Sequence, residues 1–115
     1  MNILSDYKIQ LINKTNFGKQ IFTINDYLTG CLNDFYYLEK ANDLVNHVNE
    51  VINTSGLEIE FPTQSLYLII IKNTNVNIYR DIEAWDINNN IAPDFVLPTA
   101  DFKVIVEAWR DYLQG

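Results

Sequence analysis

Two short segments near the N-terminus alternate apolar and polar residues. Tyr7–Ile12 and Gln20–Ile24 place apolar side chains at roughly every second position, which is the period of a half-buried β-strand. Between them, Asn16-Phe17-Gly18 has the composition of a turn. The pattern therefore predicts an N-terminal β-hairpin.

From Asn25 onward the apolar residues are spaced by threes and fours, as in one buried helical stripe. The stripe consists of Leu28, Leu32, Phe35, Leu38, Ala41, Val45, Val48 and Ile52. Asn25 is a suitable N-cap because its side chain can accept hydrogen bonds from the first free amides. Gly30 and the Asn33-Asp34 pair are poor helix formers, so the predicted helix covers mainly residues 34–53.

Three segments after this helix have the composition of β-strands and are separated by turn residues. They are Leu57–Phe61, Ser65–Lys72 and Val76–Ile82. Residues 66–71 are apolar at every position, which is typical of a strand that is buried on both faces. We therefore expect a central strand here, covered by a helix on one side and by another element on the other.

A second long helix is predicted at the C-terminus, with Thr99 as its N-cap and Asp101 in its first turn. Its apolar stripe consists of Phe102, Ile105, Val106, Trp109 and Leu113. The expected fold class is α+β: an antiparallel sheet of about four or five strands with two helices, near residues 34–53 and 100–113, packed on it. A chain of 115 residues fits a single domain, residues 1–115.

Composition narrows the range of partners and compartments. The chain has 8 Lys and Arg residues against 15 Asp and Glu residues, and a net charge of -7 disfavours binding to nucleic acid or to an anionic membrane surface. Its single cysteine, Cys31, cannot form an internal disulfide bond. We find no signal-peptide pattern in residues 1–10, and the longest apolar run, residues 66–71, is too short to span a bilayer. These features predict a cytoplasmic protein.

The residues that catalysis most often uses are not arranged in a recognisable motif. His47 lies in an Asn-rich helical stretch, and we interpret both it and Cys31 as structural. Glu58 and Glu60 share one face of a predicted strand, as an acid–base pair would, but alternating carboxylates are typical of a solvated strand face. We therefore expect no catalytic residues and no enzymatic activity.

Residues 86–90 begin like a calcium-binding loop, with oxygen-bearing side chains at alternate positions. The pattern then fails, because Ile91 replaces the required glycine and Leu97 replaces the bidentate glutamate. We interpret the segment as a polar loop. The sequence predicts no metal site, and the absence of a glycine-rich phosphate loop predicts no cofactor.

Acidic residues are concentrated in the second half of the chain. The stretch from residue 81 to residue 101 contains five acids and no basic residue, with Trp85 and Phe95 interleaved. Carboxylates beside aromatic anchors are suited to binding a basic protein, since charges speed the encounter and desolvated aromatic side chains contribute affinity. The predicted partner-binding surface consists of Asp81, Glu83, Trp85, Asp86 and Asp94. The alternative interpretation is a solubilising loop whose Trp85 packs into the core.

The C-terminal segment resembles a known family. Pro93–Phe102, followed by Ile105-Val106, Trp109 and Tyr112-Leu113, is similar to the C-terminal signature of small bacterial immunity proteins of contact-dependent growth inhibition and other polymorphic toxin systems. This resemblance implies a cytoplasmic inhibitor that binds the C-terminal toxin domain encoded by its neighbouring gene, commonly a nuclease, and blocks it without catalysis. The signature marks architecture and not contact residues, because its aromatic side chains are expected in the core.

Other classes of function stay open at this point. One is a small acidic adaptor or regulatory protein that acts by self-association through its apolar sheet or by binding a host partner. A second is an enzyme that uses Glu58, Glu60 or His47. The sequence leaves the oligomeric state and the identity of the toxin undetermined.

Overall fold

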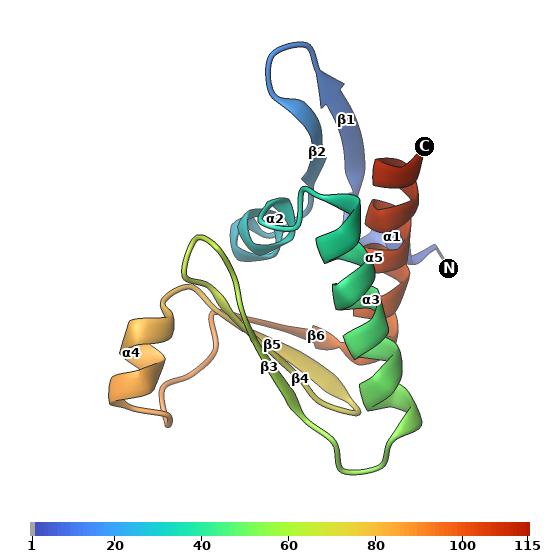
Figure 1. Ribbon diagram of the computed structural model, residues 1–115. Coiled ribbons are helices and arrows are strands. Elements are labelled where there is room, and N and C mark those ends of the chain that lie inside the picture. Colours follow the sequence, from blue (N-terminus) through green and yellow to red (C-terminus); the bar gives the residue numbers. More distant parts are fainter. Residues whose placement is uncertain (1) are drawn as a thin grey trace.

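The computed structural model describes residues 2–115 and has an α+β fold, as predicted: α3 and α5 lie side by side on a four-stranded antiparallel sheet (Figure 1). In chain order the elements are α1 (Ile3–Asp6), β1 (Gln10–Lys14), β2 (Gly18–Phe22), α2 (Asp26–Asn33), α3 (Leu38–Asn53), β3 (Ile59–Pro62), β4 (Leu68–Ile71), β5 (Asn75–Tyr79), α4 (Ile82–Ile87), β6 (Phe95–Pro98) and α5 (Thr99–Gln114). The two predicted long helices are therefore present.

The sheet has the strand order β3-β4-β5-β6, so β4 lies inside it and all four of its residues are buried. Ile69 and Ile71 belong to the main core with the long helices, whereas Leu68 and Ile70 belong to a second apolar cluster beneath α4. The prediction of a strand covered on both faces is confirmed for residues 68–71, but residues 65–67 lie before the strand and Leu66 is exposed. The edge strands β3 and β6 each end in a proline.

The N-terminal hairpin is confirmed, but it forms a separate two-stranded sheet that projects from the body of the fold (Figure 1). Lys19 attaches it to the end of α5, because its ammonium group donates hydrogen bonds to the carbonyl oxygens of Tyr112, at 2.8 Å, and Leu113, at 3.3 Å. Carbonyl groups at a helix C-terminus have no partners within the helix, so a cation is favourable there.

The predicted helical stripe from Asn25 is divided between two helices. α2 ends at Asn33, α3 begins at Leu38, and Phe35 between them is still buried, so the apolar spacing continues across a break in the backbone. Gly30 is required in α2 because a Cβ atom there would overlap the hydroxyl group of Tyr67. Ile52, predicted to be buried, is 40% exposed, and Val51 takes the buried position.

The segment after β5 also differs from the prediction. The expected strand Val76–Ile82 ends at Tyr79, and a short helix, α4, follows, so that Asp86 and Ile87 are helical and the polar loop begins only at Asn88. β6 was not expected.

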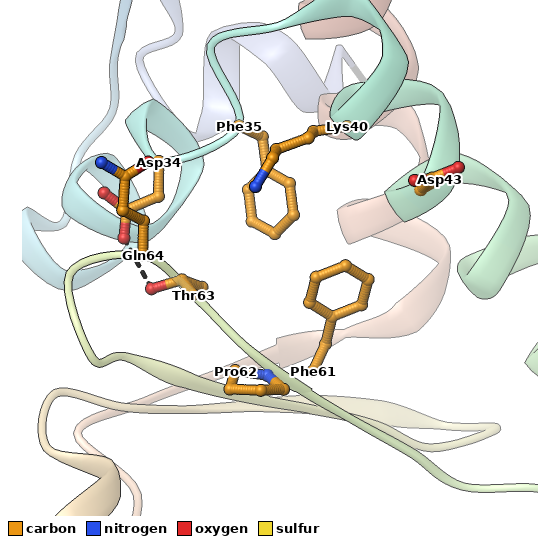
Figure 2. Close-up of a pocket in the computed structure, with 8 residues that line it drawn as sticks. All are labelled: Asp34, Phe35, Lys40, Asp43, Phe61, Pro62, Thr63 and Gln64. Atoms are coloured by element: carbon orange, nitrogen blue, oxygen red, sulfur yellow. Dashed lines mark hydrogen bonds between the residues drawn. The ribbon is translucent and has the colours of Figure 1, made fainter.

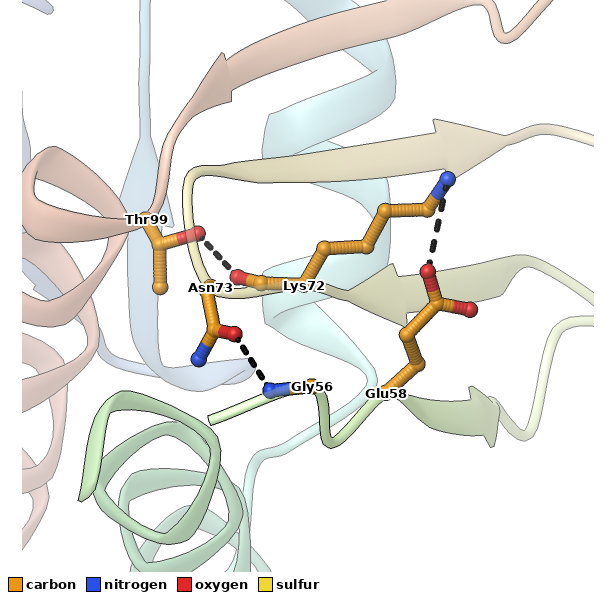
Figure 3. Close-up of polar contacts among 5 residues, drawn as sticks. All are labelled: Gly56, Glu58, Lys72, Asn73 and Thr99. Atoms are coloured by element: carbon orange, nitrogen blue, oxygen red, sulfur yellow. Dashed lines mark hydrogen bonds and ion pairs between the residues drawn. The ribbon is translucent and has the colours of Figure 1, made fainter. Parts of the chain in front are cut away.

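Thr99 is the first residue of α5 and not its N-cap. Its hydroxyl group donates to the carbonyl oxygen of Lys72 at 2.6 Å instead of capping the helix (Figure 3). This contact joins the start of α5 to the turn between β4 and β5.

The main core contains part of the C-terminal signature, chiefly the apolar residues on one face of α5. Phe102, Ile105 and Trp109 are fully buried, which confirms that this part of the motif supports the fold. Among residues 2–115, no helix is both long enough and apolar enough to cross a membrane.

Tyr7 links the N-terminal segment to α5. Its hydroxyl group donates to Asp101 Oδ2 at 2.8 Å, and burial, this hydrogen bond and the nearby charges of Asp101 and Asp6 raise the pKa of Tyr7 from 10.0 to about 12. Because the folded protein holds the phenol proton more tightly, this contribution to stability is complete below pH 10 and is lost as the pH rises through about 12.

We therefore expect the free energy of unfolding to fall less steeply between pH 10 and 12 in Tyr7→Phe than in the wild type, as measured by urea denaturation at each pH. Equal slopes in the two proteins would contradict this linkage.

Candidate partner-binding surface

α4 carries most of the predicted surface and is fixed at its start by Asp81. The Asp81 Oδ1 atom accepts hydrogen bonds from the amides of Glu83, at 2.9 Å, and Ala84, at 3.4 Å, as an N-cap does. The side chains of Asp81, Glu83 and Asp86 are all exposed. Three of the predicted carboxylate groups are therefore accessible on or beside one short helix.

Trp85 holds α4 against the sheet. Its ring centroid lies 6.4 Å from that of Tyr79, and it packs on the apolar cluster formed by Leu68, Ile70 and Tyr79, together with Ile82 and Ile91. The Trp85 side chain is half-buried, so much of the ring is engaged within the fold. This packing positions the helix that carries the carboxylates.

Asp94 joins the loop after α4 to the end of β5. Its Oδ2 atom accepts a hydrogen bond of 2.7 Å from the backbone amide of Arg80, and its own amide donates to the carbonyl oxygen of Ile78 at 2.9 Å. Asp81 and Asp94 therefore both lie beside Arg80. The structure brings all five predicted residues to one end of the molecule, around α4 (Figure 1).

Sequence reasoning missed the contribution of Arg80. Its guanidinium group lies 4.5 Å from the centre of the Tyr67 ring, and its Nη1 atom donates to the carbonyl oxygen of Ser65 at 3.2 Å. Arg80 and Ser65 line an open groove of about 420 Å³ together with Leu66, Asp81 and Glu83. The pairing of β4 with β5 brings the two chain segments together, and no local pattern indicates it.

Two exposed aliphatic side chains accompany the carboxylates. Leu66, in the groove, is 51% exposed, and Ile87, at the end of α4, is 89% exposed. Sequence reasoning assigned Leu66 to a buried strand and Ile87 to a polar loop. The apolar part of this surface therefore includes residues that the charge pattern did not identify.

Asp34 fixes the turn that leads to the groove. Its carboxylate accepts hydrogen bonds from the Thr63 hydroxyl at 2.5 Å, the Ser65 amide at 3.0 Å and the Ser65 hydroxyl at 2.7 Å. A smaller hollow of about 130 Å³ lies next to this contact, where the rings of Phe35 and Phe61 meet edge to face at 5.2 Å (Figure 2). The contact ties the end of α2 to the turn between β3 and β4.

Cys31 and His47 are placed apart from this surface. Cys31 is fully buried in α2, and burial, reinforced by the charge of Asp34, raises the pKa of its thiol, which disfavours the nucleophilic thiolate. The His47 ring lies edge-on to Phe61 at 5.2 Å, and its Nδ1 atom lies 3.6 Å from Glu50.

The two strand glutamates lie on the surface near β3. Glu58 is 3.8 Å from the ammonium group of Lys72 (Figure 3). Glu60 is exposed. Within residues 2–115, no three His, Cys, Asp or Glu side chains are grouped so that they could hold a metal ion.

Comparisons with models of known protein families, with curated proteins and with solved structures found no match. The fold class is therefore established by the structure itself.

Proposed function

We propose that this protein is a cytoplasmic immunity protein that binds a cognate toxin domain and neutralises it without catalysis. The observation that carries the proposal is the gathering of exposed carboxylates at α4, next to exposed aliphatic side chains. The C-terminal resemblance supports the same function. The rest of the fold serves as a scaffold that holds this surface.

A basic nuclease is the class of toxin that fits the surface best. An enzyme that binds phosphate groups has a positively charged active site, and carboxylates can occupy that site in place of the substrate. The net charge of -7 also favours rapid encounter with a basic partner. Inhibition by occupation requires no reaction of the immunity protein itself.

The proposal is tested with a triple variant and the toxin domain encoded by the gene directly upstream. Asp81→Asn keeps the helix cap, while Glu83→Lys and Asp86→Lys reverse two charges. We expect the association rate constant to fall by roughly tenfold or more at low ionic strength, and the difference to shrink as salt is added. Stopped-flow fluorescence measures both effects.

The matched control makes the same change in net charge on α3, with Asp43→Asn, Glu39→Lys and Glu50→Lys. These residues are exposed and lie away from α4 (Figure 1). The control should slow association much less. Equal slowing in the two variants would remove α4 from the proposed contact, and failure of the wild-type protein to bind or inhibit the upstream toxin would reject the proposed function.

A further inference from the structure

Leu66 has a backbone conformation that glycine usually adopts. Its φ angle is +70°, its amide donates to the carbonyl oxygen of Thr63, and its own carbonyl oxygen accepts from the amide of Ile82, both at 3.0 Å. A side chain in the left-handed region is strained, and burial offsets only part of this energetic cost because Leu66 is 51% exposed. The exposed part of this aliphatic side chain is accessible to a binding partner.

The side chains across the groove make this position suitable for binding. Glu83 lines the same groove as Leu66, and Ile87 follows Glu83 by four residues, so the two occupy one face of α4. Trp85 points to the other face, toward the sheet. Glu83 therefore belongs both to the groove that contains Leu66 and to the face of α4 that carries the exposed Ile87.

The charged groups around the groove indicate which kind of partner segment could bind there. The carboxylates of Asp81 and Glu83 line the groove, while the guanidinium group of Arg80 is engaged with the Tyr67 ring and the Ser65 carbonyl oxygen. A second copy of this chain that docked through the same surface would bring like charges together at α4, which is unfavourable. A segment that carries Lys or Arg beside a large apolar side chain complements both the charges and the aliphatic groups.

We propose that Leu66 is an apolar anchor of the partner-binding surface and that its occupant is a basic segment of the toxin domain with a large apolar side chain. This inference rests on the proposed function and extends the contact from α4 to the turn between β3 and β4. The carboxylates steer the encounter, and Leu66 slows dissociation because its exposed half becomes buried in the complex.

The test separates folding from binding, because the two are expected to respond differently to Leu66→Gly. Glycine adopts a positive φ without strain, so the Tm should be unchanged or higher by a few degrees. The Kd for the upstream toxin domain should rise by roughly tenfold or more, mainly through faster dissociation. Leu66→Asn, which also tolerates this conformation, should behave in the same way.

Ile52→Gln on α3 is the matched control, since Ile52 is also a partly exposed aliphatic residue, at 40%, and lies away from α4 (Figure 1). It should leave the Kd unchanged. If the wild type binds the toxin and the charge variant associates slowly, but Leu66→Gly binds as tightly as the wild type, the anchor is rejected while the proposed function stands.

Two other outcomes also reject the anchor. One is a concentration-dependent dimer that Leu66→Gly abolishes, which would assign the groove to a second copy of the chain. The other is failure of the wild-type protein to bind the toxin, which removes both proposals together.

Discussion

Replacing Trp109 with alanine is expected to lower the free energy of unfolding by about 3–5 kcal/mol. Trp109 is fully buried on α5, and its indole Nε1 group donates to the carbonyl oxygen of Phe35 at 2.9 Å. The substitution leaves a cavity in the main core and also removes the partner of a buried carbonyl group in the α2–α3 connection. Urea denaturation followed by circular dichroism measures the loss.

Two further variants separate these contributions. Trp109→Phe keeps much of the apolar volume but removes the indole donor, so it should give an intermediate loss. Trp85→Ala changes the other tryptophan, which lies half-buried in the smaller cluster, and should cost less than Trp109→Ala. A loss of less than about 1 kcal/mol in Trp109→Ala would mean that the ring is not packed as described.

Asn33→Ala should destabilise the fold by about 2–4 kcal/mol, although asparagine is a poor helix former and α2 by itself would gain from alanine. The Asn33 side chain accepts from the Ile21 amide at 3.1 Å and donates to the Ile21 carbonyl oxygen at 2.8 Å. Ile21 is fully buried, so the substitution leaves two backbone polar groups without partners. Chemical denaturation provides the measurement.

Asn46→Ala on α3 is the control, because Asn46 is exposed and alanine should be neutral or favourable there. Asn33→Asp keeps an acceptor for the Ile21 amide but places a carboxylate against the Ile21 carbonyl oxygen, so it should also be destabilising. If Asn33→Ala were as stable as the wild type, the link between α2 and the hairpin would contribute nothing.

The long elements were predictable because each buries one repeated stripe. The 3.6-residue period places Val45 and Val48 on one side of α3, and the same period places Phe102 and Trp109 on one side of α5. The break between α2 and α3 was missed because Phe35 continues the apolar spacing outside a helix. The spacing of apolar residues indicates which positions are buried, but it does not indicate where a helix ends. The break between α2 and α3 depends on polar contacts with distant segments.

Short elements escaped prediction for a different reason. α4 has six residues and depends on the Asp81 cap and on the contact between Trp85 and Tyr79, and β6 has only four residues. Neither segment is long enough to show a periodic pattern.

The charge of α4 could be predicted from the sequence, because Asp81, Glu83 and Asp86 are only a few residues apart, whereas Asp94 is brought beside Arg80 by the fold. The contributions of Leu66 and Arg80 to this surface could not be predicted from the sequence. They depend on the pairing of β4 with β5 and on the backbone conformation of one turn residue.

Each edge strand of the four-stranded sheet ends in a proline, which limits how another chain can pair with the sheet. Pro62 and Pro98 have no amide hydrogen, so neither border of the sheet offers a full set of donors for an added strand. Backbone pairing is largely independent of side-chain identity, so the prolines discourage another chain from adding a strand at either edge. Under the proposed function, the toxin domain would therefore be recognised through side chains, and single surface substitutions could alter that contact while the core stays unchanged.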